Sequence, residues 1–342
     1  MQLIRDIGEK GLLERLQRFC PTEIIGDDGA VIPTLPGHDL VVTTDVLVDK
    51  VHFSLGTTSP EDAGWRAVAA NLSDLAAMGA TPLGITVGLA LPGDVAVSWV
   101  ERLYQGMNQC LQTYNTAIIG GDVCKSSVIT VAITAFGQVE PCNVIRRDGA
   151  KVGDAIVVTG VHGASRAGLE LLLHPELGQL LRESDRNSLI KAHQRPQPRL
   201  DVLPILKQIA PIAGMDSSDG LADAVLQLCK ASSVGATIER QNIPMPSAFT
   251  NWLSQNQALD YALYGGEDFE LVLCMPIVQA QSIVQKLSSA AIIGTITASQ
   301  EVVLCDESNR NPDQLLNGDR SFQHFDALIC QPEDLSKSSQ NS

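Results

Sequence analysis

Aspartates beside glycine and hydroxyl residues recur along this chain, and together they could hold divalent cations. The stretch MDSSDGL at 215–221 places Asp216 and Asp219 directly before an expected helix. Comparable acidic stretches are GDDGAV at 26–31, TTDVLVDKVHF at 43–53, NLSD at 71–74, GGDVCKS at 120–126 and GGEDFEL at 265–271. Mg²⁺ prefers hard oxygen ligands and keeps substrate phosphates in its coordination sphere. The series therefore predicts chemistry on a phosphorylated substrate with bound Mg²⁺.

Each stretch alone also has an ordinary structural explanation. Carboxylates cap helix N-termini, so Asp216 and Asp219 fit helix capping as well as metal binding. The stretch GDDG is by itself more typical of a solvent-exposed turn. A single histidine such as His52 more often packs or faces solvent than reacts. Only the joint occurrence of these stretches, in this order, favours a cation site.

Two common phosphate-binding motifs are absent from the sequence. No two glycines are separated by a single residue, which excludes the dinucleotide fingerprint, and no glycine precedes a lysine, which excludes a Walker A loop. We expect Thr43, Thr44 and Asp45 where a strand leaves its sheet, the usual place for ligand sites in α/β sheets. The two glycines before Asp122 predict a turn whose backbone N–H groups can approach a phosphate.

Hydrophobic patterning predicts alternating strands and helices around these stretches. Residues 39–48 form an apolar run typical of a buried strand. A helix is predicted between the capping residue Ser59 and the terminating residues Gly79 and Pro82. Further expected elements are strands at 83–92, 127–139 and 155–160 and helices at 95–114 and 163–173.

The pattern restarts near residue 140, which predicts two tandem domains. The expected domains are residues 1–140 and 141–330, followed by a polar tail at 331–342 that we expect to be disordered. The expected fold class is α+β, with α/β-type layers. Strands 83–92 and 127–139 contain more apolar residues than one layer of helices covers, which predicts dimerisation through the N-terminal domain.

The composition limits the partners and the location of the protein. The 342 residues include 39 acidic and 24 basic ones, so the formal net charge is −15, which argues against nucleic acid as a partner. No apolar stretch approaches the roughly 18 residues that span a membrane. The charged N-terminus lacks the apolar segment of a signal peptide. The eight cysteines form no CxxC pair, which favours reduced thiols in a cytoplasmic protein.

The order of the motifs resembles one enzyme family. Beside the stretches above, the chain contains RRDGAKVGD at 146–154, GASRAGLELLL at 163–173 and YGGEDFEL at 264–271. From residue 1 to about 326 the sequence resembles the thiamine-monophosphate kinase family, within the aminoimidazole-ribonucleotide-synthetase-like superfamily of ATP-using proteins. The resemblance implies a two-domain α+β fold, a homodimer joined through the N-terminal domains, and an ATP site in a cleft beside their contact.

The resemblance also implies a reaction and its residues. The terminal phosphoryl group of ATP would pass directly to the phosphate of thiamine monophosphate, which gives thiamine diphosphate. Several Mg²⁺ ions would be held by Asp28, Thr43, Thr44, Asp45, Asp74, Asp122, Asp216 and Asp219. ATP would be contacted by Tyr104, Gly121, Asp122, Arg147 and Ser218. The thiamine phosphate would be contacted by His52, Glu267 and Phe322, the last packing on the thiamine rings.

Charge balance agrees with this implied reaction. Both substrates carry negative phosphates, so cations held by aspartates must offset their repulsion. The acceptor oxygen is already ionised at neutral pH and needs no strong base. Two alternatives remain, a related enzyme such as selenophosphate synthetase or aminoimidazole ribonucleotide synthetase, and a non-catalytic regulator that binds Mg-nucleotide. The selenophosphate enzyme would need a reactive cysteine beside a lysine in a glycine-rich N-terminal segment, and Cys20, followed by PTEII, lacks that setting.

Overall fold

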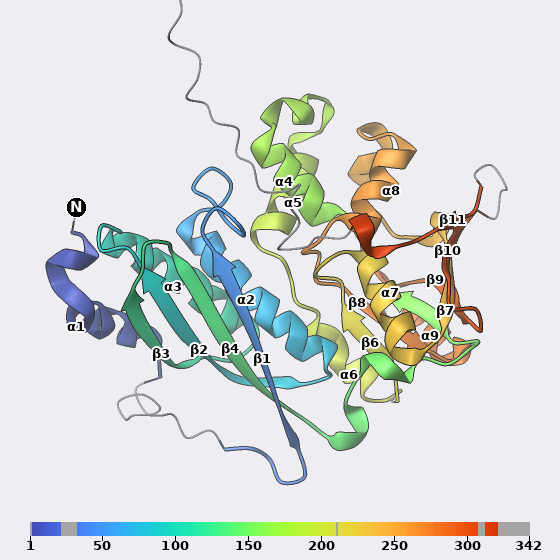
Figure 1. The fold of residues 1–342 in the computed structure, drawn as a ribbon, viewed down its shortest axis with the longest axis horizontal. Helices are drawn as coiled ribbons and strands as arrows, with labels where there is room; N and C mark the ends of the chain where they lie inside the picture. Colours follow the sequence, from blue (N-terminus) through green and yellow to red (C-terminus); the bar gives the residue numbers. More distant parts are fainter. Residues whose placement is uncertain (1, 22–32, 210, 307–311, 321–342) are drawn as a thin grey trace, which may run out of the picture.

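The computed structural model describes residues 2–21, 33–209, 211–306 and 312–320 of the chain (Figure 1). Two of the predicted site residues, Asp28 and Phe322, lie outside these ranges, as does the tail at 331–342. The described residues form two mixed β-sheets, each with its own layers of helices. Among them, no helix is long and apolar enough to cross a membrane.

The first sheet has the strand order β1-β4-β2-β3. Strand β4 pairs antiparallel with both β1 and β2, whereas β2 and β3 are parallel. The strands are β1 (Asp39–Val48), β2 (Thr81–Leu91), β3 (Ile118–Lys125) and β4 (Thr130–Val139). The strand predicted at 39–48 is confirmed with the same bounds.

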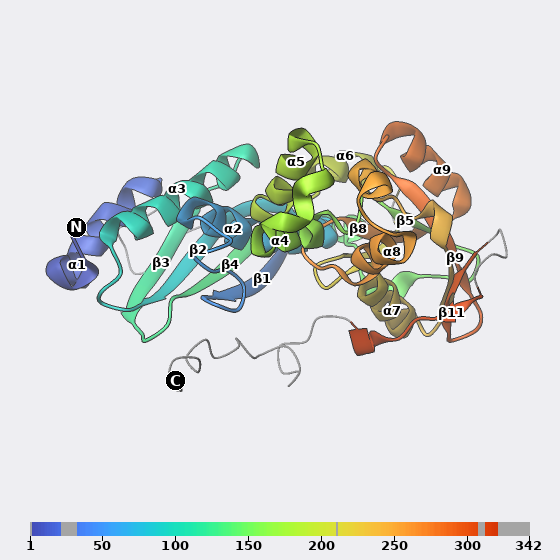
Figure 2. The same cartoon turned by 90° about the horizontal axis from the view of Figure 1, so that it is seen from above.

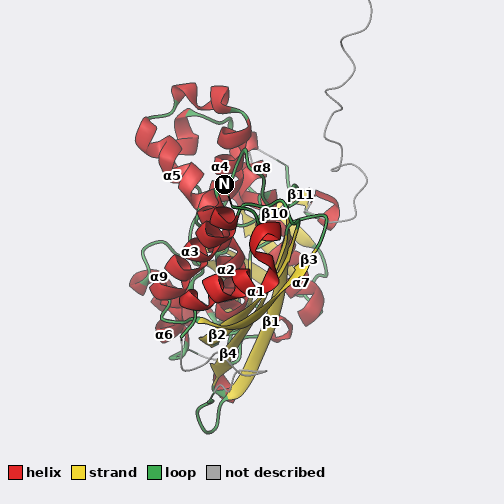
Figure 3. Cartoon of the chain, turned by 90° about the vertical axis from the view of Figure 1, so that its left-hand side faces the viewer, coloured by secondary structure: helices red, strands yellow, loops and turns green. Residues whose placement is uncertain are grey.

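Helices cover only one face of this sheet in the described part of the chain. They are α1 (Ile4–Leu16), α2 (Pro60–Ala77) and α3 (Val97–Thr113), and all three lie on the same side of the strands (Figures 2 and 3). The covered face is fully buried at Ile85, Val87 and Ile133. The opposite face, called the outer face below, leaves Leu40 and Val42 about half exposed.

Helix α2 has the boundaries that its sequence predicts. The Ser59 hydroxyl accepts a hydrogen bond from the backbone N–H of Asp62 at 3.2 Å, so it caps the first turn. The helix ends before Gly79, whose φ of +74° is a left-handed conformation that glycine adopts readily. Helices α2 and α3 approach closely because Gly106 has no side chain, since a Cβ there would lie 1.8 Å from the carbonyl oxygen of Glu61.

The second sheet has the strand order β11-β10-β7-β9-β5-β8-β6. Its strands are β5 (Ala155–Val158), β6 (Ala213–Asp216), β7 (Gly235–Glu239), β8 (Leu271–Met275), β9 (Ala291–Thr297), β10 (Val302–Cys305) and β11 (Gln314–Leu315). The helices of this half are α4 (Ala164–Leu173), α5 (Glu183–Gln194), α6 (Leu203–Leu206), α7 (Leu221–Ser232), α8 (Gln255–Tyr264) and α9 (Ile277–Lys286).

Both faces of the second sheet are covered, as strand β5 shows. Ile156 and Val158 pack in a core with residues of α7, whereas Ala155 and Val157 pack in a second core with α6 and α9. All four side chains are buried because they alternate between two covered faces. The sheet therefore holds the ends of β6 and β8 rigidly, and the loops that follow or precede these ends carry predicted site residues.

Helix α2 also joins the two halves of the molecule, because it lies between the first sheet and the second (Figure 1). It contacts β6 and α5 of the C-terminal half as well as β1 and β4 of the N-terminal half. Its side-chain bonds to the C-terminal half include those of Asp62 to Arg195 at 2.6 Å, Trp65 Nε1 to Pro196 O at 2.8 Å, and Ser73 Oγ to Asp216 Oδ2 at 2.6 Å.

Candidate functional site

An acidic cluster forms where β1, α2 and the end of β6 meet. Thr43 and Asp45 pair with Ala135 and Ile133 across the sheet, which places them on the face that α2 covers. The Thr43 hydroxyl donates a hydrogen bond to Asp74 Oδ2 on α2. The sheet and the helix thus bring a hydroxyl group and two carboxylates together from distant parts of the N-terminal half.

The C-terminal half supplies the other side of this cluster. Asp216 is the last residue of β6 and is buried, and its Oδ2 accepts a hydrogen bond from Ser73 Oγ at 2.6 Å. The Ser218 hydroxyl lies 3.5 Å from Asp216 Oδ1. Asp219 follows in the same loop, before Gly220 turns the chain with a φ of +105° and α7 begins at Leu221. MDSSDGL is therefore a loop and a helix start, as its sequence predicts, and it also contains the end of β6, which the sequence did not predict.

The carboxylates of the cluster repel one another. Burial, together with the negative charges of Asp74 and Asp219, raises the pKa of Asp45 to about 6. Burial and the charge of Asp74 raise the pKa of Asp216 to about 7, although the Ser73 hydroxyl opposes this shift. The guanidinium of Arg147 lowers the pKa of Asp216 and of Asp74 but does not reverse the upward shift caused by burial. The cluster therefore has an excess of negative charge that a cation would stabilise.

The donor set fits Mg²⁺ when a phosphorylated ligand is bound with it. In the described ranges, no three His, Cys, Asp or Glu side chains are grouped closely enough to hold a metal ion by themselves. Mg²⁺ commonly takes only one or two carboxylates and completes its octahedron with water and substrate phosphates. The hard oxygens of Thr43, Asp45, Asp74 and Asp216, with their mutual repulsion, match that kind of site.

We expect Mg²⁺ to stabilise the protein more at about pH 8 than at about pH 5. The folded-state pKa values of Asp45 and Asp216, about 6 and about 7, lie above the ordinary value for aspartate. Ionising these groups therefore removes stability as the pH rises from about 4 to about 7. Mg²⁺ offsets the repulsion only where the carboxylates are ionised.

Melting temperatures measured with and without MgCl₂ at both pH values check this expectation. NaCl at the same ionic strength is the control for general screening. A shift of equal size at both pH values would contradict the assignment of the effect to Asp45 and Asp216.

The position of Thr44 corrects the expectation that Thr43, Thr44 and Asp45 lie at a strand end. They lie in the middle of β1, which continues to Val48 because its apolar pattern continues. Side chains alternate along a strand, so Thr44 points to the outer face. There its hydroxyl lies 2.9 Å from that of Thr134. Within one chain, Thr44 is therefore separated from Thr43 and Asp45 by the sheet.

Gly121 and Asp122 also differ from the expectation, because they lie inside β3 and not in a turn. Gly121 pairs with Val87 and Asp122 with Gly88 of β2. A Cβ at Gly121 would lie 2.3 Å from the Val87 carbonyl oxygen, so the glycine allows close strand packing. Asp122 is exposed at the edge of the sheet opposite β1. One chain alone does not bring Asp122 to the acidic cluster.

The structure places the remaining predicted ATP contacts in different surroundings. Arg147 is exposed, and its side chain donates a hydrogen bond of 2.6 Å to Gln227 of α7. It is close enough to the cluster to influence the pKa of Asp216. Tyr104 instead lies in the N-terminal core, where its ring centroid is 5.6 Å from that of Phe19. Its role in binding ATP stays a prediction.

The two described residues of the predicted acceptor side lie close together. His52 follows β1, and its Nδ1 accepts a hydrogen bond of 3.0 Å from the Val48 backbone. Arg66 of α2 donates to the His52 carbonyl oxygen at 2.8 Å and to both carboxylate oxygens of Glu267 at 2.5 and 2.6 Å. Burial raises the pKa of Glu267, but Arg66 and His193 more than offset this effect, so the pKa lies below its usual value.

Sequence reasoning missed Arg66, Ser73 and His193. A signal was available for the first two. Ser73 and Asp74 come seven and eight positions after Arg66, so all three residues lie toward the same side of α2. Arg66 is also a charged residue within the mainly apolar stretch AGWRAVAAN. No comparable pattern marks His193.

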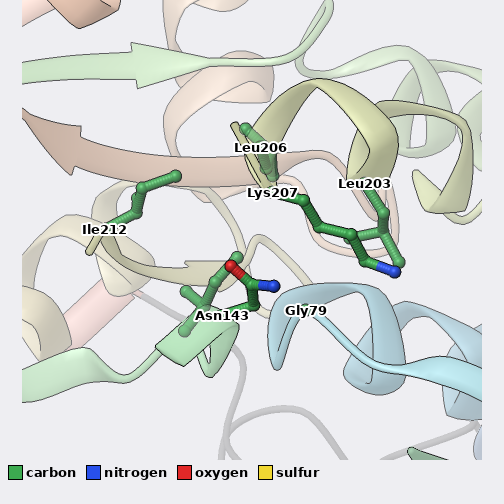
Figure 4. Close-up of a pocket in the computed structure, with 7 residues that line it drawn as sticks. Gly79, Asn143, Leu203, Leu206, Lys207 and Ile212 are labelled. Carbon is green, nitrogen blue, oxygen red and sulfur yellow. The ribbon is translucent and has the colours of Figure 1, made fainter. Parts of the chain in front are cut away.

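Two cavities found in the described part of the chain lie away from this site. One has a volume of about 10 Å³, enough for about one water molecule, and lies between Gly79, Asn143 and the residues Leu203, Leu206, Lys207 and Ile212 (Figure 4). The other has a volume of about 480 Å³ and is lined by Arg240, Phe249 and other residues of 240–259, with Asp306. Neither is lined by a predicted site residue.

Family models match both halves of the chain. The model for the AIR synthase related protein, N-terminal domain, matches residues 26–139. The model for the AIR synthase related protein, C-terminal domain, matches residues 151–306.

Individual relatives are similar over nearly the whole chain. The thiamine-monophosphate kinase of Synechococcus elongatus is 51% identical over 330 residues, which cover 94% of this chain and 98% of that protein. The crystal structure of thiamine-monophosphate kinase from Stenotrophomonas maltophilia K279a has a TM-score of 0.75 at 32% identity, over 86% of this chain and 94% of that chain. A structure described as AaThiL complexed with AMPPCP and TMP has a TM-score of 0.72 at 32% identity, over 92% of this chain and 98% of that chain. By sequence and by fold, the chain belongs to the thiamine-monophosphate kinase family.

Proposed function

We propose that this kinase transfers the terminal phosphoryl group of ATP directly to the phosphate of thiamine monophosphate, giving ADP and thiamine diphosphate. The acidic cluster at the contact of the two halves carries the proposal. Hydroxyl and carboxylate oxygens of Thr43, Asp45, Asp74 and Asp216 meet there, within the electrostatic range of Arg147. Such a cluster suits two phosphorylated ligands that repel each other unless cations lie between them.

The chain's own residues divide the work of this reaction. Asp45, Asp74, Asp216 and Asp219 would hold Mg²⁺, with Thr43 orienting Asp74 through its hydroxyl group. Mg²⁺ bound there would neutralise phosphate oxygens and align the donor with the acceptor. Asp28, Thr44 and Asp122 complete the ligand set that we propose from the family resemblance.

Direct transfer needs no nucleophilic side chain, and the Ser–His pair nearest to the cluster does not supply one. His162 Nε2 lies 3.1 Å from Ser217 Oγ, directly beside Asp216. Ser217 is 1% exposed, and its hydroxyl also donates a hydrogen bond to the Glu270 carbonyl oxygen at 3.1 Å. His162 is fully buried, which lowers its pKa to about 4. The pair is a buried structural contact, and substrate cannot reach it.

Product analysis tests the proposed reaction. The purified protein is incubated with ATP, MgCl₂ and thiamine monophosphate, and thiamine diphosphate and ADP are quantified by chromatography. We expect the two products in equal amounts and no phosphorylated protein by intact mass spectrometry. Absence of thiamine diphosphate at saturating substrates would overturn the function, and a phosphoenzyme during turnover would overturn the direct route.

We also propose that a second copy of the chain covers the outer face of the first sheet. In the described part of the chain this face carries no helix, and Leu40, Val42 and Val46 are 53%, 52% and 45% exposed. Exposed apolar side chains gathered on one sheet face are commonly buried by self-association. Thr44 and Asp122, which one chain separates from the acidic cluster, lie on this same face.

Light scattering is expected to give twice the 36.5 kDa mass of one chain at micromolar concentration. Val42→Lys places a charge at the centre of the proposed contact and should weaken the dimer about 100-fold or more. Val278→Lys, at a more exposed position on α9, is the matched control and should leave the mass unchanged. A monomeric wild-type protein would refute the proposal.

A further inference from the structure

The backbone of Glu267 is held in a defined conformation. Glu267 has a φ of +67°, a conformation that non-glycine residues adopt rarely. Its backbone N–H donates a hydrogen bond of 2.7 Å to the carbonyl oxygen of Ser218. This bond joins the GGEDFEL stretch to the loop that follows β6. The predicted acceptor contact and the predicted ATP contact are therefore connected through the backbone.

The side chain of Glu267 is held by a residue from the other half of the molecule. Arg66 on α2 is 3% exposed, and one of its terminal nitrogens lies 2.5 and 2.6 Å from the two oxygens of the Glu267 carboxylate. The other terminal nitrogen donates to the His52 carbonyl oxygen at 2.8 Å. A single buried guanidinium thus links both described residues of the predicted acceptor side.

The charge that opposes Glu267 comes from Arg66. His193 Nδ1 lies 3.7 Å from Glu267 Oε2 and 3.1 Å from Ser165 Oγ. Burial and the nearby Arg66 lower the pKa of His193 to about 4, so this imidazole is neutral at physiological pH. Removing the guanidinium would take away the positive charge that lowers the pKa of Glu267 most, together with one of the two effects that lower the pKa of His193.

We infer that Arg66 is a positioning residue for the acceptor, which keeps the Glu267 carboxylate charged and in a fixed place where the two halves meet. The inference rests on the proposed function, which makes the acceptor thiamine monophosphate. Its thiazolium ring is permanently cationic, so an ionised and fixed carboxylate attracts it. The side chain of Glu267 is 34% exposed despite its bond to Arg66, so part of this side chain remains open to a ligand.

A purely structural role for Arg66 is the competing explanation. Other ion pairs already join the halves, because Arg195 Nε bonds Asp62 Oδ1 of α2 at 2.6 Å. Arg195→Gln removes a contact of similar length on the same helix without touching His52 or Glu267. It is therefore a matched control for loss of an interdomain ion pair.

Steady-state kinetics and direct binding of thiamine monophosphate by calorimetry test the inference. Arg66→Gln should raise the KM and the Kd for thiamine monophosphate about tenfold or more, while the KM for ATP changes less than about twofold. Arg66→Lys keeps the charge and should recover part of the loss. Arg195→Gln should lower the melting temperature without changing either KM.

A double variant keeps the inference testable if Arg66→Gln alone does not fold, because it removes the unpaired buried charge as well. If Arg66 acts through Glu267, Arg66→Gln/Glu267→Gln should bind the acceptor no more weakly than Glu267→Gln alone. A double variant that is clearly weaker would overturn the inference, and so would a folded Arg66→Gln with wild-type acceptor affinity. Absence of product formation by the wild-type enzyme would instead count against the proposed function.

Discussion

Replacing Asp216 by Asn is expected to lower kcat by about 10²–10³ while leaving the fold intact, because in the proposed reaction the lost charge would face the transferred phosphoryl group and its cations. The substitution keeps the side-chain volume and an oxygen that can accept the hydrogen bond from Ser73. It also removes the repulsion between Asp216 and the carboxylates of Asp74 and Asp45, which contributes to the raised pKa of Asp216 in the wild-type protein. The melting temperature without Mg²⁺ should therefore stay the same or rise at neutral pH.

This prediction is specific because kcat should fall while the melting temperature stays the same or rises. Turnover of Asp216→Asn and of the wild type is compared at several Mg²⁺ concentrations, with melting temperature measured on the same samples. Asp201→Asn removes an exposed carboxylate that pairs with Arg199 and serves as the control. A kcat near the wild-type value for Asp216→Asn at low Mg²⁺ would contradict metal binding by the MDSSDGL stretch and favour helix capping instead.

A second large effect is expected from Gly106→Ala, which should destabilise the protein by about 3 kcal/mol or more. Helix propensity alone would favour alanine over glycine by about 1 kcal/mol. A Cβ at residue 106, however, would lie 1.8 Å from the Glu61 carbonyl oxygen and 2.5 Å from its carbon, so α2 and α3 would have to move apart. Overpacking of a rigid backbone contact outweighs the propensity gain.

Urea unfolding of Gly106→Ala, followed by circular dichroism, measures this cost. Gly93→Ala is the control, because its Cβ would meet Arg5 at an ordinary 3.6 Å. Since α2 carries Asp74, a folded Gly106→Ala protein should also lose activity. A variant as stable as the wild type would show that the two helices can separate without cost.

Much of the fold could be predicted from local patterns. The bounds of β1 follow from one apolar run, and the start and end of α2 follow from Ser59 and Gly79. These signals are local, so they do not depend on what packs against the element. The strand order of the seven-stranded sheet could not be obtained in this way, because β5 lies between β8 and β9, far from it in the sequence.

The arrangement of the candidate site was predicted in part, and the errors have two causes. The structure brings together Thr43, Asp45, Asp74 and Asp216, which the sequence placed in one candidate site through their motifs, while their role stays a prediction. Sequence reasoning treated glycine as a sign of a turn at Gly121, where the missing side chain instead allows close strand packing. It also overlooked strand alternation, which separates Thr44 from its two neighbours.

Arg66 shows what the sequence alone cannot provide. Its partner Glu267 lies 201 positions away, and the contact exists only because α2 lies against the C-terminal half. The acidic motifs predict metal binding through their composition. A single arginine in an apolar helix acquires a role only through its neighbours in space.

Helix α2 sets a fixed length scale within the molecule. Arg66 and Ser73 are seven positions apart on it, about two turns and roughly 10 Å along the helix axis. Arg66 bonds Glu267 and Ser73 bonds Asp216, so the length of this helix segment sets the distance between the proposed acceptor and phosphate positions. One inserted residue between them would turn the second contact by about 100° and lengthen the span by about 1.5 Å. A change in chain length within this part of α2 would therefore alter the reach from donor to acceptor, which is set by a count of helical residues.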